Sequence, residues 1–158
     1  MTDSDERYTP QHVIDVVRKF GPIACDPCTI ASNPTGAALH YTREDDGLTQ
    51  QWPADGVIWV NPPYSRGRLK PWITTCYARQ TPTNHILALI PSDLGSKAGA
   101  FAASTADGLC FVRGRLKFST PDGPMTEGTK QPSIIVYWGR ETKRFADTFA
   151  DLGVTWKR

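Results

Sequence analysis

The sequence has no apolar run long enough to cross a membrane. A spanning helix needs about eighteen or more consecutive apolar residues, and no stretch of this chain approaches that length. The amino terminus, with Asp3, Asp5 and Glu6, also lacks the basic and apolar regions of a secretory signal peptide. These two absences predict a cytoplasmic protein with no membrane partner.

A strong charge of either sign is also missing, because 18 Lys and Arg residues against 16 Asp and Glu residues leave a formal net charge of +2. Proteins that bind nucleic acids usually carry a strong basic patch, so the total charge alone does not predict such a partner. The cations are unevenly distributed, however, with one cluster at Arg66, Arg68 and Lys70 and another at Arg113, Arg115 and Lys117. A charge run is usually a solvated face, but two basic clusters that border one site are suited to contacting phosphates.

Closely spaced metal ligands are few. Cys25 and Cys28 have the C-x-x-C spacing that can indicate zinc or redox chemistry, but a second close pair of ligands is lacking, and the three histidines are scattered. A redox pair would sit at a helix start, whereas Cys25 lies in an apolar run typical of a strand. We therefore predict no metal site, and we expect the four thiols to be structural or to line a site.

The periodicity of the remaining sequence predicts an α/β fold. With 158 residues the chain has room for one domain, residues 1–158, and no internal repeat is visible. We expect helices near 10–20, 69–79, 96–104 and 141–152, and strands near 23–25, 37–41, 57–61, 86–91, 109–112, 133–138 and 154–156. Asp26 and Pro27 should close the first strand. Apolar strands that alternate with helices favour a mostly parallel sheet covered on both faces, with an antiparallel edge formed by the last strands.

The four residues Asn61, Pro62, Pro63 and Tyr64 follow the apolar strand at Val57–Val60. Prolines fix φ and restrict the residue before them, so the carbonyls of Asn61 and Pro62 are held rigidly next to an amide and an aromatic ring. The alternative is a simple strand terminator, since Pro cannot continue a ladder. Open α/β sheets bind ligands at the carboxyl ends of their strands, which favours a site here for a flat, amino-bearing molecule.

The stretch from Asp46 to Ser65, with D-G-L-T-Q-Q-W and V-I-W-V-N-P-P-Y-S, resembles the small DNA adenine-N6 methyltransferases encoded by phages and prophages. The resemblance extends to Tyr8-Thr9-Pro10, Asp26-Pro27-Cys28 and Pro91-Ser92, and spans most of residues 8 to 139. It implies a minimal Rossmann-like class I fold that uses S-adenosylmethionine and works in a bacterial host cytoplasm. It leaves open a role in restriction-modification.

The resemblance also implies a catalytic set, Asn61, Pro62, Pro63 and Tyr64. The Asn61 side-chain oxygen and the Pro62 carbonyl would accept the two hydrogens of the adenine amino group, and Tyr64 would stack on an adenine flipped out of duplex DNA. For Tyr64 the alternative is a core aromatic.

Cofactor contacts follow from the same resemblance, at Thr9, Pro10, Asp26, Pro27, Cys28 and Asp46. The glycine-rich turn that usually follows the first strand of this superfamily is absent, as it is in the small phage-type enzymes. Thr9 and Pro10 can instead be a helix cap and a first-turn proline, and Asp46 can be a turn residue before Gly47.

No segment is long enough for a separate target-recognition domain. The DNA-facing parts should therefore be the polar connection over 113–132 and the residues beside the proline motif, which together supply Ser65, Arg66, Arg68, Lys70, Arg113, Arg115, Lys117 and Lys130. The alternative for 113–132 is a solvent-exposed hairpin. Alternatives to DNA methylation are methylation of an RNA base or a protein glutamine amide, and a nucleic-acid-binding module without catalytic activity. The oligomeric state stays open.

Overall fold

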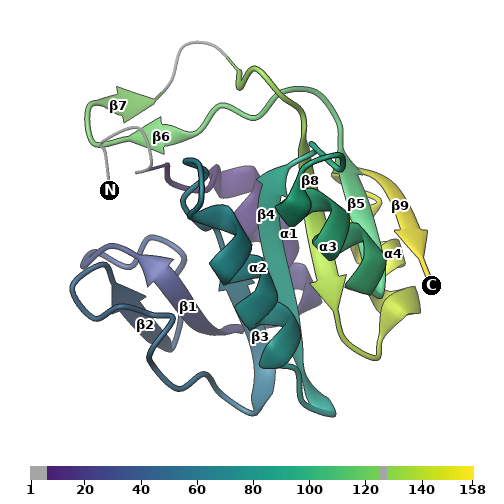
Figure 1. Ribbon diagram of the computed structural model, residues 1–158, viewed down its shortest axis with the longest axis horizontal. Coiled ribbons are helices and arrows are strands. Elements are labelled where there is room, and N and C mark those ends of the chain that lie inside the picture. Colours follow the sequence, from purple (N-terminus) through teal and green to yellow (C-terminus); the bar gives the residue numbers. More distant parts are fainter. Residues whose placement is uncertain (1–6, 125–127) are drawn as a thin grey trace.

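The computed structural model describes residues 7–124 and 128–158, which form a mixed α/β structure around a seven-stranded sheet (Figure 1). The helices are α1 (Gln11–Phe20), α2 (Leu69–Ala78), α3 (Lys97–Thr105) and α4 (Thr142–Phe149). The strands are β1 (Ile23–Thr29), β2 (Leu39–Thr42), β3 (Asp55–Val60), β4 (Thr83–Pro91), β5 (Gly108–Val112), β6 (Ser119–Thr120), β7 (Gly123–Pro124), β8 (Ser133–Trp138) and β9 (Gly153–Lys157). Within the described ranges, no helix is both long and apolar enough to span a membrane.

Both faces of the sheet are covered, as the sequence predicts. Alternate residues of the central strands point to opposite faces, so Trp59 and Leu87 pack with α1 and α4, whereas Ile58 and Ile86 pack with α2 and α3. Figure 1 shows these helix pairs on the two sides of the sheet. Because both faces are buried, apolar residues follow one another without alternation over 57–60 of β3, 86–90 of β4 and 134–138 of β8.

The order of the sheet is β2-β1-β3-β4-β8-β5-β9. Pairing is parallel from β2 through β4 and antiparallel from β4 through β9. The described sheet thus has three parallel and three antiparallel pairings, and the prediction of a mostly parallel sheet with an antiparallel edge is wrong in this balance. The reason is that β8 does not lie at an edge but inserts between β4 and β5. β8 runs antiparallel to both of its neighbours, β4 and β5, so β5 runs in the same direction as β4. The carboxyl ends of β1 to β5 therefore lie at one edge of the sheet.

Two predicted features need correction. β1 does not end before Asp26 but continues to Thr29, because β2 pairs with its second half at Asp26 and Thr29. The connection 113–132 is not simply polar, since Leu116 and Phe118 are buried in the core and β6 and β7 form a hairpin. Leu116 and Phe118 alternate with Arg115 and Lys117 in the sequence, so the stretch resembles a polar loop although two of its side chains attach it to the core. Residues 125–127 of the predicted loop lie outside the described residues.

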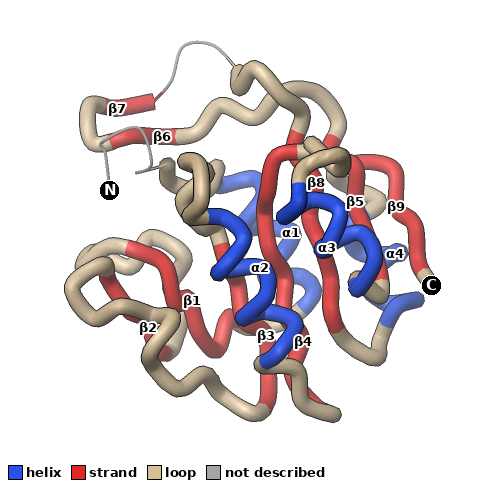
Figure 2. Tube along the Cα trace, in the orientation of Figure 1, coloured by secondary structure: helices blue, strands red, loops and turns tan. Residues whose placement is uncertain are grey.

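The hairpin β6-β7 extends beyond the carboxyl edge of the sheet, beside the amino-terminal segment (Figure 2). Tyr8 and Ser119 form an antiparallel bridge, with Tyr8 N donating to Ser119 O at 2.8 Å and Ser119 N donating to Tyr8 O at 3.3 Å. The beginning of the chain and the long connection are thus joined at the edge where α/β sheets place ligands.

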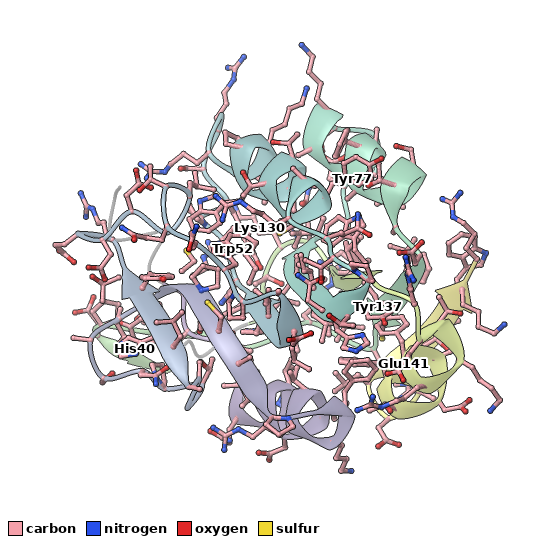
Figure 3. All side chains as sticks on the ribbon, turned by 90° about the horizontal axis from the view of Figure 1, so that it is seen from below. His40, Trp52, Tyr77, Lys130, Tyr137 and Glu141 are labelled. Atoms are coloured by element: carbon pink, nitrogen blue, oxygen red, sulfur yellow. The ribbon has the colours of Figure 1, made fainter. Side chains whose placement is uncertain are left out.

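A separate polar group closes the opposite end of the sheet. His85 Nδ1 lies 2.8 Å from Tyr137 Oη, which also accepts a hydrogen bond from the Glu141 backbone N at 3.1 Å. Figure 3, viewed from below, shows Tyr137 and Glu141 next to each other. The Tyr137 ring stacks on Phe145 with 4.8 Å between centroids, so this group caps the core at that end of the sheet.

Candidate active site

A pocket opens where β1 and β3 separate. Their pairing ends at Cys25 and Ile58, although β3 continues to Val60 and β1 to Thr29. The empty space between its walls, including open solvent at the mouth, is about 840 Å³. Its walls come from the amino-terminal segment, β1 and the residues after it, the turn at 42–48, the proline motif and the start of α2.

Asp26 forms the floor and is nearly inaccessible, with 2% of its surface exposed. Its carboxylate accepts a hydrogen bond from Thr35 Oγ1 at 2.8 Å and another from Cys28 N at 3.2 Å. Burial raises the pKa of Asp26 to about 6, and these hydrogen bonds oppose that rise. A buried carboxylate that lines a pocket and has a displaced pKa is typical of a functional residue.

The turn carrying Asp46 presses against β1. Asp46 has φ of +54°, a left-handed conformation that is uncommon for a residue with a side chain. A Cβ atom on Gly47 would lie 1.9 Å from the Pro27 carbonyl oxygen, so no larger residue fits without movement of the backbone. Asp46 is thereby held at the pocket wall, close to the residues that follow Asp26 in β1.

Trp52 and Arg79, which were not predicted as site residues, hold the turn that carries Asp46 in place. Trp52 Nε1 donates to Gly47 O at 2.9 Å, and the Trp52 ring stacks on Trp72 with centroids 6.4 Å apart. The Arg79 guanidinium lies 5.1 Å from the Trp52 ring centroid and donates to the carbonyls of Leu48 and Gln50, at 3.0 and 2.6 Å. The only signal in the sequence was the W that ends the D-G-L-T-Q-Q-W run.

Asn61 lines the pocket and is held by the amino-terminal segment. Its Nδ2 donates to Arg7 O at 2.7 Å and to Thr9 Oγ1 at 3.2 Å. Thr9 Oγ1 also accepts a hydrogen bond from Trp59 Nε1 at 3.1 Å. Thr9 is therefore bonded to Asn61, a contact beyond the cofactor role that the sequence predicts for it.

Tyr64 packs inward in this structure. Its ring meets Phe118 edge-on with centroids 6.2 Å apart, and its hydroxyl lies 2.9 Å from Leu89 O and 3.2 Å from Asn61 Oδ1. Burial raises the pKa of this phenol. Tyr64 is absent from the pocket lining, so these contacts are those of a core aromatic, and stacking on a base stays a prediction.

The pocket gathers most of the predicted chemical residues. Thr9, Asp26, Pro27, Cys28, Asp46, Asn61, Pro63 and Arg68 line it, whereas Pro10 and Pro62 do not. Pro62 and Pro63 are both buried, which holds the backbone of the motif rigid. Residues that the prediction missed also contribute, namely Arg7, Tyr8, Thr29, Ile30, Pro34, Thr35, Thr42, Arg43, Gly47, Leu48 and Trp72.

The predicted DNA-facing cations lie outside the pocket except for Arg68. Arg66, Lys70, Arg113, Arg115, Lys117 and Lys130 are exposed, and Ser65 is half-buried. Arg115 donates to the carbonyls of Thr129 and Lys130 and so ties the two ends of the long connection together. Among the described residues, the other cations of both clusters form no ion pair with a carboxylate.

The thiols agree with the expectation of structural or site-lining residues. Cys25, Cys76 and Cys110 are buried, and burial raises their pKa values, whereas Cys28 is half-buried at the pocket wall. No group of three or more His, Cys, Asp or Glu side chains that could hold a metal ion occurs in residues 7–124 and 128–158.

Comparison with models of protein families identifies the family to which the matched residues are similar. A family model described as DNA N-6-adenine-methyltransferase (Dam) matches residues 1–150 of the chain. A search of curated proteins finds no match. The matched range includes the pocket, the proline motif and the whole connection between β5 and β8.

Proposed function

Because the chain belongs to the DNA N-6-adenine-methyltransferase (Dam) family, we propose that it transfers a methyl group from S-adenosylmethionine to the N6 amino group of adenine in duplex DNA. The observation that supports this proposal best is the meeting of Asn61, Asp26 and Asp46 in one pocket at the carboxyl edge of the sheet. The pocket thus combines the Asn61 amide with the buried carboxylate of Asp26 and the turn carboxylate of Asp46.

The residues of the pocket fit the cofactor that this reaction needs. S-adenosylmethionine supplies an electrophilic methyl group when bound. Asp26 and Asp46 offer acceptors for its amino and hydroxyl groups, and Arg43 and Arg68 offer cations for a carboxylate. The close approach of Gly47 to the Pro27 carbonyl holds the turn that carries Asp46 against β1.

Asn61 is the central catalytic residue of the proposal. The lone pair of an adenine amino group is delocalised into the ring, so the nitrogen is a poor nucleophile. When Asn61 Oδ1 and the Pro62 carbonyl accept its two hydrogens, they favour a pyramidal nitrogen with its lone pair free for in-line attack. Activation then depends on oriented acceptors rather than on a strong base, and positioning of this kind lowers barriers by several kcal/mol, on the order of values for other oriented groups.

The target adenine has to leave the duplex to reach Asn61, at a cost of a few kcal/mol. Stacking of the base on one aromatic ring returns about 1 to 3 kcal/mol. Contacts between the protein and the DNA phosphates are therefore needed as well to offset the cost of base flipping. We propose that the cations at 66–70 and 113–117, with Ser65 and Lys130, supply them. Tyr64 can stack on the base only if its ring leaves the contact with Phe118, and we propose this movement as part of base flipping.

We further propose that residues 1–158 form one site-specific methyltransferase domain of the Rossmann-like class I type, with 113–132 as its DNA-facing part. The common direction of β1 to β5 and the pocket at their carboxyl ends support that class. Phage origin, a place in the host cytoplasm and a role in restriction-modification stay predictions from the sequence.

Transfer of tritium from labelled cofactor to unmethylated duplex DNA tests the proposal directly. We expect label in DNA with the native chain and at least about 100-fold less with Asn61→Ala, because an oriented acceptor is lost. Parallel reactions with RNA and with a glutamine-containing protein test the two other substrates. Cofactor binding without transfer to DNA would overturn the proposal, and in that case the binding-module alternative would be favoured.

A further inference from the structure

The amino-terminal strap, residues 7–10, meets the catalytic amide with the Arg7 carbonyl and the Thr9 hydroxyl. Asn61 Nδ2 lies 2.7 Å from the Arg7 carbonyl oxygen, which has no hydrogen to donate. A carbonyl at this distance must face the NH₂ side of the carboxamide, since two oxygens would repel each other. The Arg7 carbonyl therefore determines which way round the Asn61 amide sits.

The Thr9 hydroxyl accommodates the same orientation, because it has a second lone pair beside the one that faces Trp59. Its Oγ1 accepts a hydrogen bond from Trp59 Nε1, a group that can only donate, and it lies 3.2 Å from Asn61 Nδ2. Both hydrogens of the Asn61 amide thus have acceptors on the strap. The strap itself is anchored to the hairpin through the bridge between Tyr8 and Ser119.

With its NH₂ side occupied, Asn61 presents only Oδ1 to a substrate. The Tyr64 hydroxyl has a single hydrogen, and its contact with Leu89 O is shorter than its contact with Asn61 Oδ1, at 2.9 against 3.2 Å. The hydrogen is therefore better placed on Leu89 O. Lone pairs of Asn61 Oδ1 stay available for an amino hydrogen.

From these contacts we infer that the strap sets the orientation of the Asn61 carboxamide, with Thr9 and the Arg7 carbonyl as positioning groups, so that this site requires an amide and does not tolerate a carboxylate. The inference rests on the proposed function and explains why position 61 carries asparagine rather than aspartate. A carboxylate at position 61 would place an oxygen against the Arg7 carbonyl, and the side chain would rotate away from the position in which it accepts the amino hydrogen.

Two substitutions test the inference through single-turnover rates at saturating cofactor and DNA. Asn61→Asp keeps the size and the acceptor atoms, and we expect it to lose about 100-fold in rate. Thr9→Val removes one acceptor, and we expect a loss of about 10-fold that Thr9→Ser largely restores. The Kd of the cofactor should change less than threefold in each variant, which separates positioning from a purely cofactor-binding role of Thr9.

Thr105→Val is a matched control for Thr9→Val. Thr105 Oγ1 also accepts a hydrogen bond from a tryptophan, Trp138 Nε1 at 3.1 Å, but it lies on α3 away from the pocket. Both variants leave one indole N–H without its partner, so their melting temperatures should fall by similar amounts. Only Thr9→Val should lose rate.

The Asn61 side-chain protons give a readout that does not depend on activity. Hydrogen exchange of the ¹⁵N-labelled Asn61 NH₂ should be slowed in the native chain and become faster in Thr9→Val but not in Thr105→Val. If the native chain transfers no methyl group, the proposed function fails while this exchange pattern still reports the orientation. Unprotected NH₂ protons in the native chain, or Asn61→Asp with more than a tenth of native activity, would overturn the inference.

Discussion

At the scale of single residues, the buried carboxylate of Asp26 lowers the stability of the folded chain at neutral pH, while the proposed function gives it a role in cofactor binding. Its pKa is raised from 3.8 to about 6 by burial, so the folded state holds this proton more tightly than the unfolded state does. Its contribution to stability is therefore complete below about pH 4 and is lost as the pH rises through 6. A shift of this size corresponds to about 3 kcal/mol.

We accordingly expect Asp26→Asn to unfold at higher denaturant concentration than the native chain at pH 8, with the advantage growing between pH 4 and pH 6 and constant above. The Thr35 hydroxyl can accept a hydrogen bond from the new amide, so the site stays satisfied. Cofactor affinity should fall in the same variant. Chemical denaturation and calorimetric titration measure the two effects.

Asp45→Asn is the control for Asp26→Asn, because the pKa of Asp45 is shifted in the opposite direction. Hydrogen bonds from the Thr42 backbone and hydroxyl lower the pKa of Asp45, which is exposed. Its contribution to stability is therefore present at neutral pH and is lost as the pH falls. A gain at pH 8 from Asp45→Asn, or none from Asp26→Asn, would contradict the assigned cause of the Asp26 shift.

At the scale of elements, the turn at 46–47 has to lie against β1 for the pocket to keep its shape. We expect Gly47→Ala to lower stability by about 1 to 3 kcal/mol, as overpacking does, because its Cβ would meet the Pro27 carbonyl at 1.9 Å. The turn would move outward with Asp46, so the Kd of the cofactor should rise. Thermal unfolding and titration with S-adenosylmethionine measure both.

Gly95→Ala is the matched control for that turn. A Cβ on Gly95 meets only the Asp93 side chain, at 3.6 Å, and its φ is outside the left-handed region. It should leave both stability and cofactor affinity close to native values. Native cofactor affinity in Gly47→Ala would mean that the turn does not form a wall of the cofactor site.

At the scale of the whole molecule, topology brings the two basic clusters to one edge. The cluster at 66–70 follows β3 and the cluster at 113–117 follows β5, and both strands run in the same direction. Affinity for DNA that depends on phosphate contacts falls with salt, with a slope of about 0.9 per contact on a double-logarithmic plot. The combined variant Arg113→Ala and Lys117→Ala should therefore reduce the slope by about 1.8.

Lys19→Ala combined with Lys143→Ala removes the same charge elsewhere. Lys19 pairs with Asp151 and Lys143 with Asp147, on α1 and α4. Fluorescence anisotropy with duplex DNA at several salt concentrations should give a native slope for this control. Equal slopes for the two combined variants would indicate attraction by net charge alone and no contact at the 113–117 cluster.

Local patterns in the sequence and the family resemblance predicted most of the elements of the main sheet and some of the residues that line the pocket, among them Asp26, Asp46 and Asn61. The apolar runs that become β3, β4 and β8 and the helical spacing of Val13, Ile14 and Val17 depend on neighbours a few residues away. The positions of Asn61 directly after β3 and of Asp46 in a turn also follow from that order, whereas Asp26 lies inside β1. These features are encoded by nearby residues, so periodicity and the family resemblance can predict them.

Contacts between distant segments decided the rest. The insertion of β8 between β4 and β5, the burial of Asp26 under Thr35 and the inward packing of Tyr64 on Phe118 have no local signal. The orientation of the Asn61 amide depends on acceptors 54 and 52 residues earlier in the chain. The sequence alone thus determined that a carboxamide follows β3, and only the tertiary structure decided which side of that carboxamide meets the strap, because hydrogen-bond partners become neighbours when the chain folds.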